Sequence, residues 1–470
     1  PDAFGPPDYA FTLRAGEHKT HELWLTYTPP GRSPAQAGAV QPLFAAAPVT
    51  WYVESGAFGL TALPDWDAWR DHEQYIRDQL DTAGTYEPWM DWFPNLPAAI
   101  EGEDFYGVFD YGDAPIDFEG YHVAPYNLKY EMDWGMWLQW ARTGDERWFR
   151  LAEAGARHAA DLDILHNLHT PRHWADGIIF GHSYHDEDGF RNPHRNYGGN
   201  HPDTAFGVPG LLLAYYLTGY EKARDAALEA ADNMEYRLHN DSHLCSYFSD
   251  CNGEGYALGE GLFQDGERPA ANSLLAMVEA YRATGKADYL AVADALVDWA
   301  RAERQPYIHG PIPGDDRYLK PWMLNLYLRS LAAYLEMKQE FGLPDNSHGR
   351  ASFLAYADWL RTQAAIDLTP IDTGPRAAYP YQWWFDGRVD VPGEDNDNRD
   401  PSVNNWLLLG ADAQAYAHRL RGDGASLDLA TRLFRAGSRD PWYEGDANTY
   451  SATKETVNSI VFGNIFLHEW

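Results

Sequence analysis

Histidine is concentrated in one segment of the chain, and its chemistry there points to proton transfer. Seven of the 18 histidines fall between residues 166 and 201. Imidazole ionises near neutral pH, so it can act as a general base or a general acid. The same segment is rich in turn-forming residues and also carries tyrosine and arginine. We expect a catalytic and sugar-binding loop here, formed by His182, Tyr184, His194, Arg195, Tyr197 and His201.

Two other interpretations of this segment stay open. A zinc site needs three or four ligands and usually has a regular pair of them on a helix. His166, His169 and His173 have helical spacing, but Pro171 interrupts the helix that would hold them. In the second interpretation, the histidines make structural hydrogen bonds within a folded loop.

A second set of candidate residues lies where predicted helices begin. Asn127, Tyr130 and Trp134 are spaced i, i+3 and i+7, which places them on one face of a helix. Such a face, if it points into a ring of helices, would line a groove for a sugar. The alternative is an asparagine that caps the helix, followed by two aromatic residues of the core.

Later helix openings repeat this pattern of amide, cationic and aromatic residues. Arg268 and Asn272 are one helical turn apart. Arginine binds carboxylates through two parallel hydrogen bonds, so Arg268 is a candidate to hold a uronate, with a salt bridge at the helix start as the alternative. The further candidates for substrate binding are Asn404, Trp383 and Trp384.

One acidic loop invites comparison with calcium sites. Residues 394–400 alternate acidic and amide side chains, as calcium loops do. However, Arg399 replaces a ligand and the loop lacks the required glycine, so the EF-hand pattern fails. A solvated loop is favoured, calcium stays the alternative, and we expect no other cofactor.

The scaffold that must position these residues is an internal repeat of helix hairpins. Glycines 144, 219, 285, 342 and 422 each follow an apolar helical stretch, at intervals of 75, 66, 57 and 80 residues. Glycine ends a helix readily because it adopts the left-handed conformation. Asp145 and Asp423 can then cap the next helix by accepting hydrogen bonds from its first N–H groups.

These hairpins predict a mainly α chain with a ring-like architecture. A terminal helix over 454–467, packed beside an early helix over 64–80, would add a sixth hairpin and close the ring. We therefore predict an (α/α)5–6 toroid over residues 63–470, with an open α-solenoid as the alternative. Residues 1–62 alternate apolar and polar positions and predict the end of a β-sandwich-like domain.

Charge and cysteine content limit the partners and the compartment. The net charge is −34, which argues against nucleic acid and anionic membranes as partners. The chain has only seven lysines beside 29 arginines, and together with the excess of acidic residues this suggests adaptation to a salty medium. No apolar run reaches the ~20 residues of a membrane helix. Cys245 and Cys251 favour a short-loop disulfide over two free thiols, and hence an extracellular or cell-surface location. The chain starts at Pro1, which suggests a processed or incomplete N-terminus.

Four stretches carry a resemblance to a known family. They are residues 126–130 (YNLKY), 139–145 (QWARTGD), 156–163 (ARHAADLD) and 210–219 (GLLLAYYLTG). In these stretches the chain resembles the YetA-like, exo-rhamnogalacturonan-lyase-like family. The resemblance implies an N-terminal β domain, an α/α toroid and β-elimination on a uronate-containing polysaccharide. Lys129 and Glu131 depart from the family's usual Glu and Asp.

A lyase of this kind needs three groups at the bond that it cleaves. Arg268, Arg195 or Asn127 would neutralise the uronate carboxylate. His182, His194 or His201 would remove the C5 proton, and Tyr130, Tyr184 or Tyr197 would protonate the leaving oxygen. The first alternative is a glycoside hydrolase, which needs two carboxylates; its candidates are Asp133, Asp186, Glu187 and Asp188. The second is a glycan-binding or surface-structural protein without turnover.

Overall fold

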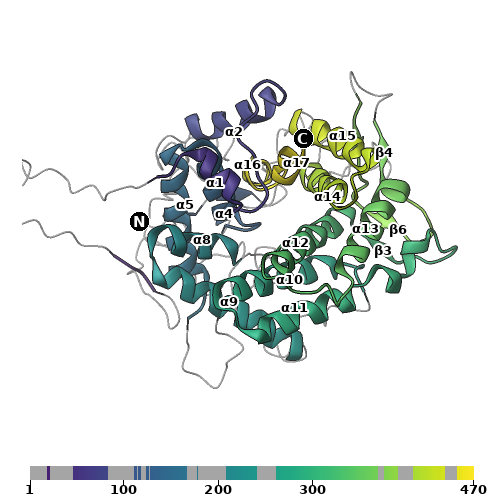
Figure 1. Ribbon diagram of the computed structural model, residues 1–470, viewed down its shortest axis with the longest axis horizontal. Coiled ribbons are helices and arrows are strands. Elements are labelled where there is room, and N and C mark those ends of the chain that lie inside the picture. Colours follow the sequence, from purple (N-terminus) through teal and green to yellow (C-terminus); the bar gives the residue numbers. More distant parts are fainter. Residues whose placement is uncertain are drawn as a thin grey trace, which may run out of the picture.

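The computed structural model is mainly helical, as predicted (Figure 1). It describes residues 18–21, 46–82, 111–113, 115–117, 123–125, 128–166, 177, 208–240, 261–368, 375–389, 406–439 and 452–470. In this part of the chain, no helix is both long enough and apolar enough to cross a bilayer.

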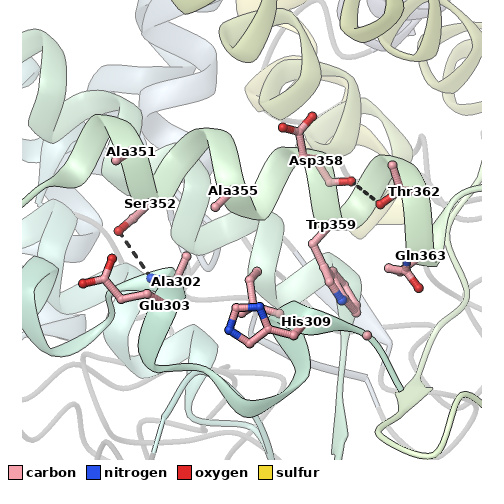
Figure 2. Close-up of a pocket in the computed structure, with 12 residues that line it drawn as sticks. Ala302, Glu303, His309, Ala351, Ser352, Ala355, Asp358, Trp359, Thr362 and Gln363 are labelled. Carbon is pink, nitrogen blue, oxygen red and sulfur yellow. Dashed lines mark hydrogen bonds between the residues drawn. The ribbon is translucent and has the colours of Figure 1, made fainter. Parts of the chain in front are cut away.

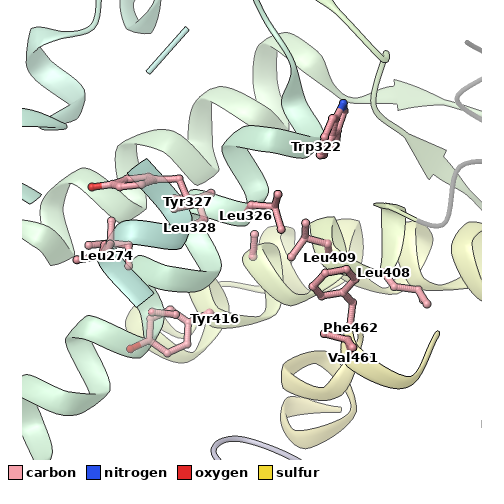
Figure 3. Close-up of a cluster of buried hydrophobic side chains, with 14 of the residues drawn as sticks. Leu274, Trp322, Leu326, Tyr327, Leu328, Leu408, Leu409, Tyr416, Val461 and Phe462 are labelled. Carbon is pink, nitrogen blue, oxygen red and sulfur yellow. The ribbon is translucent and has the colours of Figure 1, made fainter. Parts of the chain in front are cut away.

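Six of the described helices contact one another in a closed cycle. Each packs against the next in chain order, and the last packs against the first. They are α4 (Met132–Thr143), α8 (Pro209–Thr218), α10 (Glu267–Thr284), α12 (Pro321–Glu340), α14 (Trp406–Arg421) and α16 (Ala452–Val461). Side chains of α10, α12 and α14 fill the space between these helices, with Trp322 in the first turn of α12 (Figure 3). We call these six the inner helices.

A second set of helices packs around the outside of this cycle (Figure 1). They are α2 (Arg70–Thr82), α5 (Glu146–His158), α9 (Glu221–Asn240), α11 (Ala287–Trp299), α13 (Gly349–Trp359) and α15 (Gly424–Arg439). α5 and α15 alternate buried and exposed positions with helical period, whereas α14 is buried along most of its length. This difference follows from position, because an inner helix contacts neighbours on several sides and an outer helix faces water on one.

The predicted helix ends are confirmed. The repeat glycines adopt the left-handed conformation, with φ of 73° at Gly144, 73° at Gly219, 67° at Gly285, 63° at Gly342 and 73° at Gly422. The Asp145 side chain accepts a hydrogen bond of 3.0 Å from the Arg147 N–H, and Asp423 accepts one of 2.6 Å from the Ser426 N–H. Each hairpin therefore turns where the sequence places a glycine, and two of them begin their second helix with the predicted cap.

The ends of the ring meet at a seam of buried polar contacts. The Arg142 guanidinium of α4 lies 2.6 Å from the Glu73 carboxylate of α2, with side-chain exposures of 0% and 3%. Gln139 donates to the carbonyl of Ile460 at 2.9 Å. Thr456 of α16 donates to the Gln79 side chain of α2 at 3.0 Å. We call Glu73, Gln79, Gln139, Arg142 and Thr456 the closing seam, because they join the first and last described helices of the ring.

Short elements complete the described structure. The helices are α1 (Val49–Ser55), α17 (Asn464–Glu469), η3 (Ala159–Asp163), η6 (Ala302–Arg304), η7 (Pro306–His309) and η8 (Leu360–Ala364). The antiparallel strand pairs are β1 (Pro115–Asp117) with β2 (Val123–Pro125), β3 (Tyr318–Leu319) with β6 (Trp383–Trp384), and β4 (Ile366–Asp367) with β5 (Ala377–Ala378).

Three details differ from the sequence expectations. The early helix begins at Arg70 rather than near residue 64. The single terminal helix expected over 454–467 is two helices, because Gly463 has a φ of 87° and separates α16 from α17. Within the segment expected to be β-rich, the described residues 46–62 contain helix α1, whose Tyr52 ring lies 4.8 Å from that of Trp140 in α4.

Candidate active site

Four side chains from four inner helix starts meet in one cluster. The Arg268 Nη1 atom donates a hydrogen bond of 3.3 Å to the Tyr130 hydroxyl oxygen. The Tyr130 ring meets the Trp406 ring edge-on at 5.0 Å, and Trp406 stacks on Trp322 at 4.5 Å. The Arg268 guanidinium lies 6.0 Å from the Trp322 ring centre. We call Tyr130, Arg268, Trp322 and Trp406 the helix-start cluster.

The topology explains why these distant residues converge. Each inner helix is joined to the next by a returning outer helix, so successive inner helices start at the same face of the ring. The first residues of α10, α12 and α14 therefore lie together at this face. Side chains there are only partly covered: Tyr130, Arg268 and Trp406 keep some exposure.

The backbone beside this cluster adopts unusual conformations. Leu128, Tyr130 and Glu131 have φ of 48°, 60° and 63°, and the pair before α10, Gln264 and Asp265, has 52° and 68°. Non-glycine residues seldom adopt positive φ, and such strain concentrates at functional sites. The expectation that residues 127, 130 and 134 share one helix face is wrong for Tyr130, which precedes the helix. The left-handed turn delays the start of α4 to Met132.

A buried ion pair supports the next turn of α4. Arg329 Nη2 lies 2.6 Å from Glu131 Oε2, with side-chain exposures of 12% and 4%. The same guanidinium lies 4.6 Å from the centre of the Trp134 ring and 5.4 Å from that of Phe462. Trp134 is partly exposed, so it could contribute an aromatic edge beside Tyr130.

A second group extends the aromatic surface toward β3 and β6. Lys320 Nζ lies 2.7 Å from Asp265 Oδ1, and the Tyr318 hydroxyl donates to Asp265 Oδ2 at 3.1 Å. The Tyr318 ring packs against Trp384 at 5.5 Å, and Tyr381 lies 6.3 Å from Trp322. Lys320 Nζ lies 5.7 Å from the ring centres of both Tyr318 and Tyr381, so it links the two pairs of aromatic rings.

Two carboxyl groups at inner helix starts are fully buried. Burial raises the pKa of Asp133 to about 7 and that of Glu267 to about 7, and both residues have 0% exposure. Asp133 Oδ1 accepts a hydrogen bond of 2.9 Å from the Trp134 N–H, while its Oδ2 makes none within the described part of the chain. Glu267 accepts one of 3.1 Å from the Lys320 N–H. These two carboxyl groups accept backbone hydrogen bonds at the helix starts and do not face solvent.

The other sequence candidates have varied positions. Trp383 is corrected from a substrate-binding to a core residue, because it is 2% exposed and its ring packs against Trp359 at 4.9 Å. Trp384 and Asn272 are partly exposed. His166 does not serve as a zinc ligand here, since its two ring nitrogens lie 2.6 Å from Glu229 Oε2 and 2.6 Å from the Ala160 carbonyl. No group of metal-binding side chains forms among the residues described above.

Many sequence candidates lie outside the described residues. These are Asn127, His169, His173, His182, Tyr184, Asp186, Glu187, Asp188, His194, Arg195, Tyr197, His201, Asn404 and the pair Cys245 and Cys251, together with the acidic loop 394–400. Their proposed roles therefore stay predictions.

Three residues at α12 contribute to this region but were not predicted from the sequence. Trp322, Lys320 and Arg329 belong to α12 or directly precede it. A signal for the first two was present, because Pro321 sits at the first helical position, where proline is favoured, with Lys320 and Trp322 on either side. No local signal identifies Arg329, which reaches the site from the third turn of α12.

Comparisons with known proteins leave the family open. The chain matches no protein-family model and no curated protein, so the resemblance to the YetA-like family stays a prediction. Among solved structures, an unsaturated glucuronyl hydrolase from Bacillus sp. GL1, described as responsible for glycosaminoglycan degradation, is 16% identical, with a TM-score of 0.35. The match covers 52% of this chain and 59% of that one.

A second solved structure gives a similar result. It is a UGL variant with dGlcA-Glc-Rha-Glc, 18% identical, with a TM-score of 0.34 and the same coverage of 52% and 59%. This chain thus spans about three fifths of the length of both structures. These partial matches therefore give no information about the activity of this chain.

Proposed function

We propose that this protein is a glycan-degrading enzyme, and specifically a lyase that cleaves a uronate-containing polysaccharide by β-elimination. We interpret the closed cycle of inner helices as an (α/α)6 toroid whose helix starts form the active-site face. The observation that carries the proposal is the contact between Arg268 and Tyr130, 3.3 Å apart and 138 positions apart in sequence. It pairs a carboxylate-binding group with a proton donor on a partly exposed surface.

The local charge supports an anionic substrate. The chain has a net charge of −34, yet four cations gather around the inner helix starts: Lys129, Arg268, Lys320 and Arg329. Arg329 and Lys320 are ion-paired with acidic residues, and Arg268 donates a hydrogen bond to the Tyr130 hydroxyl oxygen. Arg268 is partly exposed, and arginine binds carboxylates through paired hydrogen bonds, so it is the group that we assign to the uronate carboxylate.

The aromatic rings suit the sugar itself. Trp322 and Trp406 stack on each other, and Tyr381 lies beside Trp322. Lys320 links Tyr381 to the pair formed by Tyr318 and Trp384. Sugar rings present flat C–H faces that pack on aromatic side chains, so this row would hold successive units of a chain. Arg268 lies at the Trp322 end of this row, where the uronate would be cleaved.

The reaction then distributes three tasks. Arg268 holds the uronate carboxylate and stabilises the charge that develops there when the C5 proton leaves. A histidine of the 166–201 segment, His182, His194 or His201, removes that proton. The C5–H electron pair forms the C4–C5 double bond, the C4–O4 bond breaks, and the hydroxyl of Tyr130 protonates O4. Because Arg268 donates to the Tyr130 oxygen, the hydroxyl hydrogen points elsewhere and can be directed at the leaving group.

A glycoside hydrolase is the second candidate, favoured by the raised pKa values of Asp133 and Glu267. A general acid that stays protonated at neutral pH is what such an enzyme needs. Both carboxyl groups are fully buried, however, and reach no substrate-accessible surface without rearrangement. The accessible groups of the helix-start cluster therefore favour elimination.

The test is to incubate the protein with a panel of acidic polysaccharides and measure both ultraviolet absorbance and product mass. Elimination gives an absorbing unsaturated product and conserves the parent mass, whereas hydrolysis adds one water for each bond cleaved. Saturated products would contradict the proposed reaction and favour the hydrolase. Binding without products would leave a glycan-binding protein.

A further inference from the structure

A pocket of about 380 Å³ lies on the outer rim, between η6, η7 and the end of α13 (Figure 2). Its volume falls in the ~300–1,000 Å³ range of small-molecule sites. Three alanines, 302, 351 and 355, line it together with Ile308 and Gly310, and hydrogen-bonding side chains surround them. The latter are Glu303, His309, Ser352, Asp358, Thr362 and Gln363.

Part of the pocket wall lies near the face of the ring that carries the helix-start cluster. Outer helices run back against the inner ones, so the end of α13 and the η6–η7 segment after α11 lie at the face where inner helices begin. Trp359, in the pocket wall, packs at 4.9 Å against Trp383. The neighbouring Trp384 contacts Tyr318, which hydrogen-bonds to Asp265 beside α10. A continuous path of side chains therefore joins the pocket to the proposed site.

Hydrogen bonds hold the backbone around the pocket, and two of its side chains can hydrogen-bond to a ligand. The Thr362 hydroxyl donates to the Asp358 carbonyl at 2.7 Å, and Ser352 accepts from the Ala302 N–H at 3.3 Å (Figure 2). The imidazole of His309 and the amide of Gln363 are exposed, and neither has a hydrogen-bond partner in the described part of the chain. Figure 2 shows the Trp359 indole between them.

The charge of the lining selects the kind of ligand. The wall contains Glu303 and Asp358 but no lysine or arginine, and both carboxylates are ion-paired with arginines that do not line the pocket, so the wall offers no cation to a uronate carboxylate. A metal ion is disfavoured because no group of three or more His, Cys, Asp or Glu in the described ranges could hold one. Small apolar side chains with amide, imidazole and hydroxyl groups around them suit a ligand with an apolar face and many hydroxyl groups.

We infer that this pocket binds a neutral sugar unit of the same glycan chain, as an outer subsite distinct from the uronate site at Arg268. The inference rests on the proposed function for the presence of a long glycan, and it adds the substrate class: a polysaccharide in which neutral units accompany uronates. Gln363 and His309 hydrogen-bond to hydroxyl groups, and the alanines contact the C–H face of the sugar.

The experiment is calorimetric titration of the full chain with neutral gluco-, galacto- and rhamno-oligosaccharides, and with oligogalacturonate as the anionic comparison. The variants are the double substitution His309→Ala with Gln363→Ala, and Ala355→Phe, which fills the pocket from α13. Gln339→Ala is the matched control, because Gln339 is exposed at the far end of α12. Loss of two hydrogen bonds predicts about tenfold weaker binding of a neutral oligosaccharide in the double variant.

The same affinity is expected in wild type and Gln339→Ala. The inference fails if no neutral oligosaccharide binds, if the pocket variants bind as tightly as wild type, or if the pocket variants weaken oligogalacturonate binding instead. Binding needs no turnover. If neutral oligosaccharides bind but no polysaccharide is cleaved, only the proposed reaction is contradicted. If polysaccharide is cleaved but binding does not depend on the pocket, only the proposed subsite is contradicted.

Discussion

The closing seam and the helix-start cluster both join residues that are far apart in the sequence, but they leave their polar groups in different states. In the seam, Arg142 is buried and donates to Glu73, to Gln139 and to the Ala62 carbonyl. In the cluster, Arg268 and Tyr130 contact each other at 3.3 Å on a partly exposed surface, next to a backbone with positive φ. The first arrangement closes a ring, and the second leaves groups available to a ligand.

This difference separates stability from activity. A buried charge that loses its partner destabilises the fold strongly, whereas a partly exposed one is solvated by water. Substitutions in the seam should therefore affect unfolding, and substitutions in the cluster should affect turnover.

Substitutions in the cluster should abolish most activity. Tyr130→Phe removes the proposed proton donor, and such groups typically supply about 10²–10⁴-fold in rate. We expect kcat on the acidic substrate to fall by that factor, while the free energy of unfolding changes by less than about 1 kcal/mol. Steady-state kinetics and urea denaturation measure the two quantities. A variant with full activity would remove Tyr130 from the mechanism.

Breaking the seam should have the reverse effect. Glu73→Ala leaves Arg142 buried without its carboxylate, which typically costs about 3–5 kcal/mol of stability. The matched control is Glu146→Ala, which breaks an exposed pair with Arg150 and should cost less than about 0.5 kcal/mol. Urea denaturation compares them, and equal costs would show that the seam does not hold the ring closed.

A smaller effect is expected where α4 meets α8 below the cluster. A Cβ atom added at Gly210 would lie 2.1 Å from Asp133 Oδ2, so Gly210→Ala forces the buried Asp133 carboxyl group or the α8 backbone to shift. Overpacking of this kind costs about 1–3 kcal/mol. Gly424→Ala is the control, because nothing lies within 4 Å of its added Cβ. Thermal denaturation should show a lower Tm for Gly210→Ala and an unchanged Tm for Gly424→Ala. An unchanged Tm for Gly210→Ala would contradict the close approach of Gly210 to Asp133.

The buried carboxyl group of Asp133 predicts a pH dependence of stability. Burial raises its pKa to about 7, while an unfolded aspartate titrates near ~3.9. Between these values the folded state keeps a proton that the unfolded state has lost, so this contribution is fully present below pH ~4 and is lost as pH rises toward 7. Asp133→Asn should make the fall in stability between pH 5 and 7 shallower by up to about 1 kcal/mol per pH unit. Denaturation at several pH values measures the slope, and an unchanged slope would mean that Asp133 is ionised in the fold.

Local patterns in the sequence predicted the helix hairpins well. Glycine after an apolar helical run and aspartate directly after that glycine act through neighbouring backbone atoms, so their effect depends little on the rest of the chain. The same applies to the start of α10, where Arg268 was expected and is found. The positions of Trp383 and Tyr130 were not predictable in this way. Whether a tryptophan is buried depends on contacts such as the one with Trp359, 24 positions earlier.

What the sequence determined by itself is the set of helices, their ends and the kinds of side chain at their first turns, because hydrophobic periodicity and capping are local properties. Which of those first turns meet depends on how the helices pack. Tyr130, Arg268, Trp322 and Trp406 come from four separate hairpins. Their proximity exists only because the inner helices pack in a closed cycle, and that packing depends on contacts between residues that no sequence window contains together.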